Sequence, residues 1–202
     1  MKRDKYKRKT PSKRIKDKVL ILCGGETEEI YFNHFKSKYK ENLQNVSVKV
    51  VTNKWSTPIA VINAALGLKD KYDEVWAVFD EDNFKEFDDA IMLAAKSGVN
   101  CAFSNKAFEY WFYLHFENKT GAMSLNTLSA ELEKKLGFEY GKKASAVLRT
   151  CDKISNEITS AEERAQIGHE RHILNSGPKE SKWCSCTTVY LLTKRLCRWG
   201  MV

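Results

Sequence analysis

The stretch VWAVFDEDNF, residues 75–84, decides the fold of this chain, because a short apolar run in it ends abruptly in acidic residues. Residues 75–79 are apolar without alternation, which is typical of a strand buried on both faces of a parallel sheet. Asp80 and Asp82 follow two positions apart, so both side chains can point the same way at the end of the strand. The carboxyl ends of such strands border the ligand crevice, and two carboxylates there suit Mg²⁺. The alternative is a solvated turn after a core strand.

The segments on either side of this stretch alternate between short apolar runs and helical patterns. Further strands are expected at residues 18–23, 46–51 and 99–103. Helices are expected from Glu26 onward and over residues 59–68 and 84–97. Strands and helices that alternate through short connections are typical of a doubly wound, parallel sheet. The sequence therefore predicts an α/β fold, with a mostly parallel sheet of about four strands flanked by helices.

Two glycines, Gly24 and Gly25, separate the first predicted strand from its helix. Glu26 opens that helix, and acidic residues in a first turn offset the positive end of the helix dipole. Glycines at such a turn let the backbone come close to a ligand, such as a phosphate or a metal-bound water. The alternative is a tight turn that binds nothing.

Residues 104–116, SNKAFEYWFYLHF, combine six aromatic rings with embedded polar groups. The pattern predicts one helix that is apolar all round and therefore buried. Glu109 in such a helix is costly unless it is paired or liganded, which makes it a candidate site residue. A satisfied core acid and an exposed flank are the alternatives for Glu109. His115 is expected to be a hydrogen-bonded core histidine.

The last third of the chain is predicted to be helical, as an extension (117–202) of an α/β core (18–116). Its helical patterns cover residues 125–136, 141–150, 154–174 and 187–199. The six cysteines show no CxxC pair and are expected to be reduced core thiols. His169, His172, Cys184 and Cys186 give an HxxH…CxC pattern, which is looser than a standard zinc finger but leaves structural zinc as an alternative.

Charge is concentrated at the N-terminus of this 202-residue chain. Residues 1–18 contain ten of the 34 Lys and Arg residues and two of the 26 Asp and Glu residues, so the remainder has 24 of each. A basic tail over residues 1–17 suits a polyanion, most simply nucleic acid, although it also fits a solubilising extension. No apolar run is long enough for a membrane span, and the N-terminus lacks a signal-peptide pattern, so a cytoplasmic protein without a membrane partner is expected.

Four segments in order resemble the RloB family, a Toprim-like group found beside bacterial restriction and abortive-infection loci. They are CGGETEEIYF from Cys23, FDEDNF from Phe79, SNKAFEYWFYLHF from Ser104 and CTTVYLL from Cys186. The resemblance runs from about residue 18 to residue 197. It implies a Toprim fold, in which a Glu after the first strand and an Asp-x-Asp after the third form a Mg²⁺ centre that also accepts Mn²⁺.

The resemblance places the metal-binding acids on Asp80 and Asp82 and makes Glu109 a site residue. The family pattern has Glu-Gly where this chain has Gly24-Gly25, so Glu26 is the nearest replacement for the missing acid, as metal ligand and catalytic group. A missing general base typically lowers a rate about 10²–10⁴-fold. A weakened nuclease, a metal-binding remnant and a site that uses Glu26 all stay open.

The resulting expectation is a Mg²⁺-dependent Toprim-type nuclease of anti-phage defence that acts on DNA or RNA, including tRNA. The resemblance also implies a co-encoded ATPase as a partner, and a homodimer is a further expectation. The alternative function is a catalytically degraded domain that binds nucleic acid or a protein partner.

Overall fold

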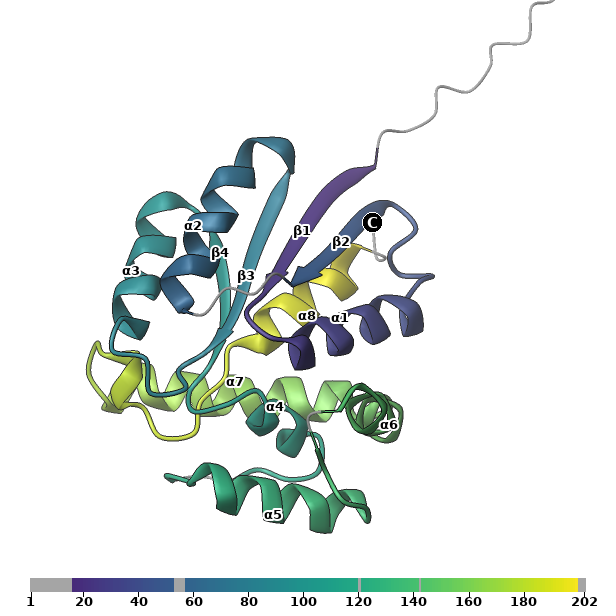
Figure 1. Cartoon of the computed structure of the whole chain (residues 1–202), viewed down its shortest axis with the longest axis vertical. Helices are drawn as coiled ribbons and strands as arrows, with labels where there is room; N and C mark the ends of the chain where they lie inside the picture. Colours follow the sequence, from purple (N-terminus) through teal and green to yellow (C-terminus); the bar gives the residue numbers. More distant parts are fainter. Residues whose placement is uncertain (1–15, 53–56, 120, 142, 200–202) are drawn as a thin grey trace, which may run out of the picture.

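The computed structural model describes residues 16–52, 57–119, 121–141 and 143–199. Within these ranges one parallel sheet has the strand order β2-β1-β3-β4 (Figure 1). Its strands are β1 (Asp17–Cys23), β2 (Val46–Thr52), β3 (Glu74–Asp80) and β4 (Asn100–Ser104). The predicted α/β fold with a parallel sheet is therefore confirmed.

Helices cover both faces of this sheet. The described helices are α1 (Glu26–Lys38), α2 (Pro58–Leu68), α3 (Phe87–Ser97), α4 (Glu109–Leu114), α5 (Leu125–Leu136), α6 (Ala144–Ile154), α7 (Ile158–Asn175) and α8 (Val189–Arg198). Figure 1 shows α2 and α3 on one face, α1 and α8 on the other, and α4 to α7 beyond the carboxyl ends of the strands. The C-terminal part is helical, as predicted.

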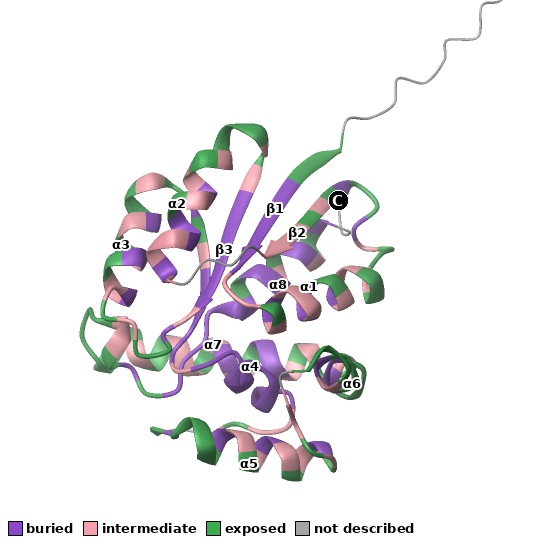
Figure 2. Cartoon of the chain, viewed as in Figure 1, coloured by how far each residue is buried: buried purple, intermediate pink, exposed green. Residues whose placement is uncertain are grey.

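The strands are apolar without alternation because each face of the sheet packs against its own helices. Alternate residues of β1 and β3 point to opposite faces. Toward α2 and α3 lie Leu20, Leu22, Val75, Ala77 and Phe79. Toward α1 and α8 lie Val19, Ile21, Cys23, Trp76 and Val78. Figure 2 accordingly shows both central strands buried over most of their length.

The strand order reverses between β1 and β3. The chain leaves β1 for β2 on one side, and then crosses to β3 on the other side of β1. The Gly24 N–H donates to the Val78 carbonyl at 2.8 Å, which extends the pairing of these two strands by one residue. Parallel sheets bind ligands at such a reversal, outside the carboxyl ends of the strands. This point therefore joins the Gly24-Gly25 turn to the acidic end of β3.

The prediction of one helix over residues 104–116 is wrong in its bounds. Ser104 ends β4, and α4 covers only Glu109–Leu114, although all six of its residues are buried as expected. Ser104 forms a β-bridge with Thr187, and the Asn105 N–H donates to the Cys186 carbonyl at 2.7 Å. A segment more than 80 residues later thus holds this stretch in an extended conformation.

The predicted helix over residues 154–174 is also wrong at its start, because Ile154 ends α6 and α7 begins at Ile158. Of the predicted basic tail, only Lys16 and Asp17 lie within the described residues, and Asp17 begins β1. All six cysteines are free, with Cys23, Cys151 and Cys186 buried. In the part of the chain that the structure describes, no helix is both long and apolar enough to cross a bilayer.

Candidate functional site

A cavity of about 400 Å³ lies at the reversal point between β1 and β3. Its walls come from the ends of β1 and β3, the first turns of α1 and α2, and the start of α4. The described lining residues are Gly24, Gly25, Glu26, Thr27, Glu28, Thr57, Pro58, Val61, Phe79, Asp80, Asp82, Phe84, Phe108 and Glu109. The structure therefore brings all the site residues predicted from the sequence to one cavity.

Asp80 and Asp82 both line the cavity because the chain turns sharply after β3. Asp80 is the last residue of β3, and its Oδ2 accepts a hydrogen bond from the Phe108 N–H at 2.9 Å. Asp82 and Asn83 have φ angles of +38° and +62°, a left-handed conformation that Asp and Asn tolerate better than most residues. The Asp82 N–H donates to the Lys106 carbonyl at 3.3 Å. The turn is therefore attached to the segment that leads from β4 to α4.

Glu81 lies between these two acids in the sequence but does not line the cavity. Its carboxylate is buried and accepts a hydrogen bond from Lys106 Nζ at 3.0 Å. A buried carboxylate needs such a partner, because an unpaired charge out of water is costly. Glu81 thus holds the turn in place, whereas Asp80 and Asp82 face the cavity.

Gly25 and Glu28 form a close pair at the start of α1. Gly25 is the N-cap residue, and Glu28 is the third residue of the helix, with only 5% of its surface exposed. A Cβ atom on Gly25 would lie 2.8 Å from Glu28 Oε2, so a larger residue would displace that carboxylate. A Cβ on Gly24 would meet only ordinary contacts, the nearest being the Val78 carbonyl at 3.4 Å. Of the two glycines, Gly25 is therefore the one whose replacement would move a carboxylate of the cavity.

Glu28 is not among the residues predicted from the sequence for this site. Glu26, which is, lies at the first position of α1 and is exposed, although it lines the cavity. Acidic residues are common in the first turn of any helix, so the sequence pattern does not distinguish the two. The one available signal is the spacing from the glycines, which puts residue 28 where a side chain can reach back to the N-cap.

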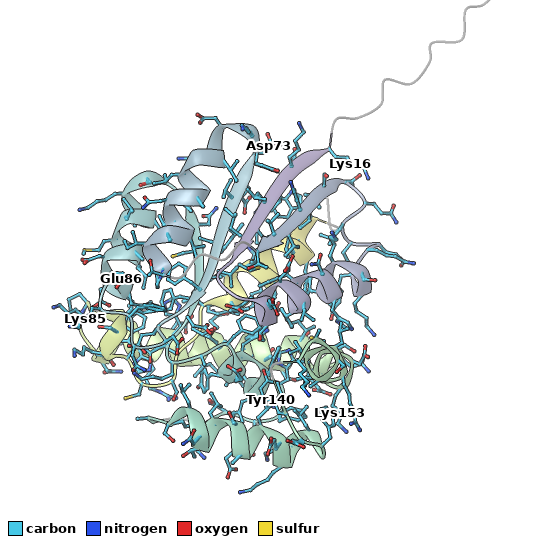
Figure 3. All side chains as sticks on the ribbon, viewed as in Figure 1. Lys16, Asp73, Lys85, Glu86, Tyr140 and Lys153 are labelled. Atoms are coloured by element: carbon cyan, nitrogen blue, oxygen red, sulfur yellow. The ribbon has the colours of Figure 1, made fainter. Side chains whose placement is uncertain are left out.

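Glu109 begins α4 and is buried, with 6% of its surface exposed. Its Oε1 accepts a hydrogen bond from the Tyr140 hydroxyl at 3.0 Å, and Tyr140 belongs to the helical C-terminal part of the chain (Figure 3). Burial, and then the Glu109 charge, raise the pKa of Tyr140 well above its usual range, so the phenol stays protonated and donates. The exposed-flank alternative for Glu109 is therefore wrong. Glu109 is a hydrogen-bonded acid that also faces the cavity.

The cavity lining is strongly acidic. Its described residues include five carboxylates, on Glu26, Glu28, Asp80, Asp82 and Glu109, and no Lys, Arg or His. Like charges gathered in a concave site repel one another unless a cation shares the space. The donor chemistry, which consists of carboxylate oxygens without sulfur or imidazole, fits a hard divalent cation such as Mg²⁺.

The described residues contain no group of three or more His, Cys, Asp or Glu side chains arranged to hold a metal ion. The acids of the cavity therefore do not supply a complete set of metal ligands by themselves. They do fit Mg²⁺, which usually keeps several waters and takes one or two carboxylates together with substrate phosphates. Asp80 and Asp82 are the acids at the end of β3, and Glu26 and Glu28 line the same cavity from the first turn of α1.

The histidines outside the cavity are engaged in hydrogen bonds. His115 Nδ1 lies 2.9 Å from the Trp111 carbonyl, and burial lowers the pKa of His115 to about 4, so the predicted core histidine is confirmed. His172 contacts the Ser176 hydroxyl and the Cys184 carbonyl, and His169 Nδ1 lies 2.9 Å from the Tyr190 hydroxyl. The HxxH…CxC residues are all among those described and do not form a zinc site.

Comparison with known proteins gives one match. No curated protein and no solved structure matches the chain. A family model described as RloB-like protein matches residues 19–196, a range that contains every residue lining the cavity. The chain therefore belongs to the family of RloB-like proteins.

Proposed function

We propose that this chain is a Mg²⁺-dependent nuclease of the Toprim type that cleaves phosphodiester bonds. The observation that carries the proposal is a cavity with five carboxylates and no cationic side chain among its described residues, at the reversal point of a parallel sheet. A phosphate enters so acidic a cavity only together with a cation. A divalent cation held by the carboxylates would supply the charge that a phosphate needs there.

The residues divide the work as follows. Asp80 and Asp82 would hold the cation, Mg²⁺ or Mn²⁺, with Glu26 or Glu28 from the first turn of α1 as a further ligand. When bound, the cation supplies charge neutralisation at the scissile phosphate. The Phe108 N–H fixes the orientation of Asp80, and the Tyr140 hydroxyl fixes that of Glu109. Glu109 is placed to accept a proton from an attacking water, and the Gly24-Gly25 backbone lets the substrate come close.

Membership of the RloB-like family supports the wider context of the proposal. We propose that the nuclease acts in the cytoplasm in anti-phage defence, together with an ATPase encoded beside it. The substrate class is nucleic acid, as DNA or as RNA including tRNA. The Toprim assignment belongs to this proposal, and the parallel α/β sheet is compatible with it.

A second candidate function is a non-catalytic module that binds nucleic acid or the ATPase. Two points favour it: Gly24 stands where the Toprim pattern that the chain resembles has a Glu, and the described residues contain no ready-made group of three metal ligands. In this case the cavity acids are remnants, and their replacement leaves biological function intact. The two candidates therefore differ in what the Asp80 and Asp82 variants do.

Cleavage of plasmid DNA, single-stranded DNA and tRNA, with Mg²⁺ or Mn²⁺, tests the proposal. We expect cleavage by the wild type, its loss in Asp80→Asn/Asp82→Asn, and its retention in Asp89→Asn, which changes an exposed acid of α3 outside the cavity. Gly24→Glu should raise the rate, because a side chain there meets no close contact. If wild type and Gly24→Glu are both inert on every substrate with the partner ATPase present, the nuclease proposal fails.

A further inference from the structure

A second cavity, of about 380 Å³, runs along α8 between α7 and β3. Its described lining residues are Trp76, Gln166, Tyr190, Leu191, Lys194, Arg195 and Arg198. Three of these residues are cationic and none is acidic, which is the reverse of the first cavity. The two cavities share no described lining residue, and the second reaches the start of β3, where Arg195 pairs with Glu74.

The cations belong to one side of α8. Leu191, Arg195 and Arg198 are spaced four and three residues apart, so they form one stripe along the helix. Arg195 is held firmly: its guanidinium donates to Glu74 Oε2 at 2.9 and 3.0 Å, and it lies 3.8 Å from the centre of the Trp199 ring. Because Glu74 already pairs with this guanidinium, Arg195 mainly shapes the wall of the cavity, and the available positive charge comes from Lys194 and Arg198.

The other two cations are more available. Lys194 Nζ donates to Gln166 Oε1 at 2.6 Å and has no ion pair with a described carboxylate, although its charge acts on the buried Glu162 nearby. Arg198 is exposed and has no hydrogen bond or ion pair with another described residue. Lys194 also lies over the ring of Tyr190, at 5.4 Å from its centre. The cavity thus presents positive charge next to aromatic and amide surface.

The basic N-terminal segment joins the chain at this same end. Lys16 is the first described residue, and Figure 3 shows it near Asp73, just before β3. The Lys18 N–H donates to Asp73 Oδ2 at 2.7 Å, which places the start of β1 beside the start of β3. Residues 1–18 carry ten Lys and Arg residues against two Asp. The basic segment is therefore attached to the sheet at the start of β1, beside the start of β3.

We propose that the amino-edge cavity, formed by α8 with Gln166 and Trp76, binds the phosphate backbone of a nucleic acid without a metal ion. The proposal deepens the proposed function, on which it rests only for the identity of the polyanion. Several cations along a stripe suit the repeated charges of a backbone better than a single small anion. Arg beside aromatic rings also suits the bases of a single strand. The acidic cavity then needs only to bind one phosphate locally.

The test measures the affinity of the full chain for a fluorescein-labelled single-stranded DNA and for tRNA, by anisotropy in EDTA over a salt series. Lys194→Glu/Arg198→Glu should weaken binding at least tenfold and reduce the slope of log affinity against log salt by about 2. Lys96→Glu/Lys153→Glu is the matched control, because both lysines are exposed, lie away from α8 and give the same change in net charge. We expect the control to change affinity less than threefold.

Three outcomes overturn the proposal. Equal losses in the two variants would mean that only net charge matters. No loss in the α8 variant, with loss when the Lys and Arg of residues 1–15 are replaced by Ser, would assign binding to the tail alone. Retained nucleic-acid binding together with lost capture of the partner ATPase would make the cavity a protein contact. Arg198→Gln, which removes charge at an exposed position, repeats the test if the double variant does not fold.

The same titration separates this inference from the proposed nuclease. Asp80→Asn/Asp82→Asn should keep wild-type affinity in EDTA, because those acids lie in the other cavity. If no variant ever cleaves, but the α8 variant alone loses binding, the binding site stands and the nuclease proposal fails. If the wild type cleaves and the α8 variant binds nucleic acid like wild type, the nuclease proposal stands and the proposed binding site fails.

Discussion

The two ends of the sheet differ in both the sign and the origin of their charge. At the carboxyl end, carboxylates converge from α1, β3, the turn after β3 and α4, which are distant in the sequence. At the amino end, all three cations come from one helix, α8. Carboxylates that come together from several segments are harder to explain by the residue preferences of any one helix. The acidic cavity is therefore the stronger candidate for a catalytic site.

Helix dipoles account for part of this contrast. α1 begins at the acidic end with Glu26, Glu28 and Glu29, and α8 ends at the basic end with Arg195 and Arg198. Such placements stabilise a helix by roughly 0.3–1 kcal/mol per charge without any ligand. Asp80 and Asp82 have no such explanation, because Asp80 ends a strand and Asp82 lies in the turn after it.

Asp80→Asn should have the largest effect. The amide keeps an oxygen that can accept from the Phe108 N–H, so the fold is retained while the negative charge is lost. We expect the cleavage rate to fall about 10²–10⁴-fold, with binding of nucleic acid in EDTA unchanged. A single-turnover cleavage assay and the anisotropy titration measure the two. If Asp80→Asn lowered the cleavage rate and the affinity for nucleic acid in EDTA by the same factor, the two cavities would not have separate roles.

Gly25→Ala and Gly24→Ala form a matched pair within the acidic cavity. Alanine at position 25 displaces the Glu28 carboxylate, whereas alanine at position 24 meets only ordinary contacts. We expect Gly25→Ala to lower cleavage or metal affinity about 10- to 100-fold, as changes to groups that orient metal ligands do, and Gly24→Ala to change it less than threefold. Equal effects would show that the position of Glu28 is irrelevant to the site.

Lowering the pH should reduce the stability of the fold through His115, at the end of α4. His115 is buried against Trp111 at the end of α4, and burial lowers its pKa to about 4, whereas an unfolded histidine has a pKa of about 6.5. Between these values the unfolded chain binds the extra proton, so stability from this residue is present above pH 6.5 and is lost as the pH falls toward 4. From pH 7 to 5 the free energy of unfolding should drop by about 2 kcal/mol from this residue.

Urea unfolding of wild type and His115→Gln at the two pH values measures this difference. The variant lacks the titrating group, so its stability should depend less on pH by that amount. An identical pH dependence in both proteins would show that His115 is not responsible.

Tyr140→Phe should have the smallest effect. It removes the hydroxyl that donates to Glu109 Oε1 and leaves the ring in place. One hydrogen bond contributes roughly 0.5–1.5 kcal/mol, so we expect a threefold to tenfold loss of cleavage and a small loss of stability. Glu109→Gln is the comparison, since it should lose far more activity than Tyr140→Phe if Glu109 takes part in proton transfer. Similar losses in both would make Glu109 a structural acid.

Much of the fold is predictable from the sequence because β1 and β3 are buried on both faces and read as continuous apolar runs. The stretch after β4 is not predictable in the same way. Its aromatic residues indicate burial, but the pairing of Ser104 with Thr187 depends on a segment 83 residues later. Local periodicity cannot report such a contact, so the predicted helix is too long.

The candidate site is predictable to the same extent. Asp80, Asp82 and the glycines follow from their positions at strand ends, and Glu109 follows from an acid placed among aromatic residues. The contact between Gly25 and Glu28 becomes visible only in three dimensions. The amino-edge cavity needs the packing of Gln166 and Trp76 around α8, and neither residue has a distinctive pattern in the sequence.

The central claim is that the acidic cavity takes a divalent cation together with a phosphate. Calorimetric titration of Mn²⁺ into wild type and Asp80→Asn/Asp82→Asn, each with and without an uncleavable phosphorothioate oligonucleotide, tests it most directly. The account predicts binding to wild type that strengthens when the oligonucleotide is present, and no binding to the variant at this site. Absence of Mn²⁺ binding to wild type with the oligonucleotide bound, or equal binding to both proteins, would contradict it.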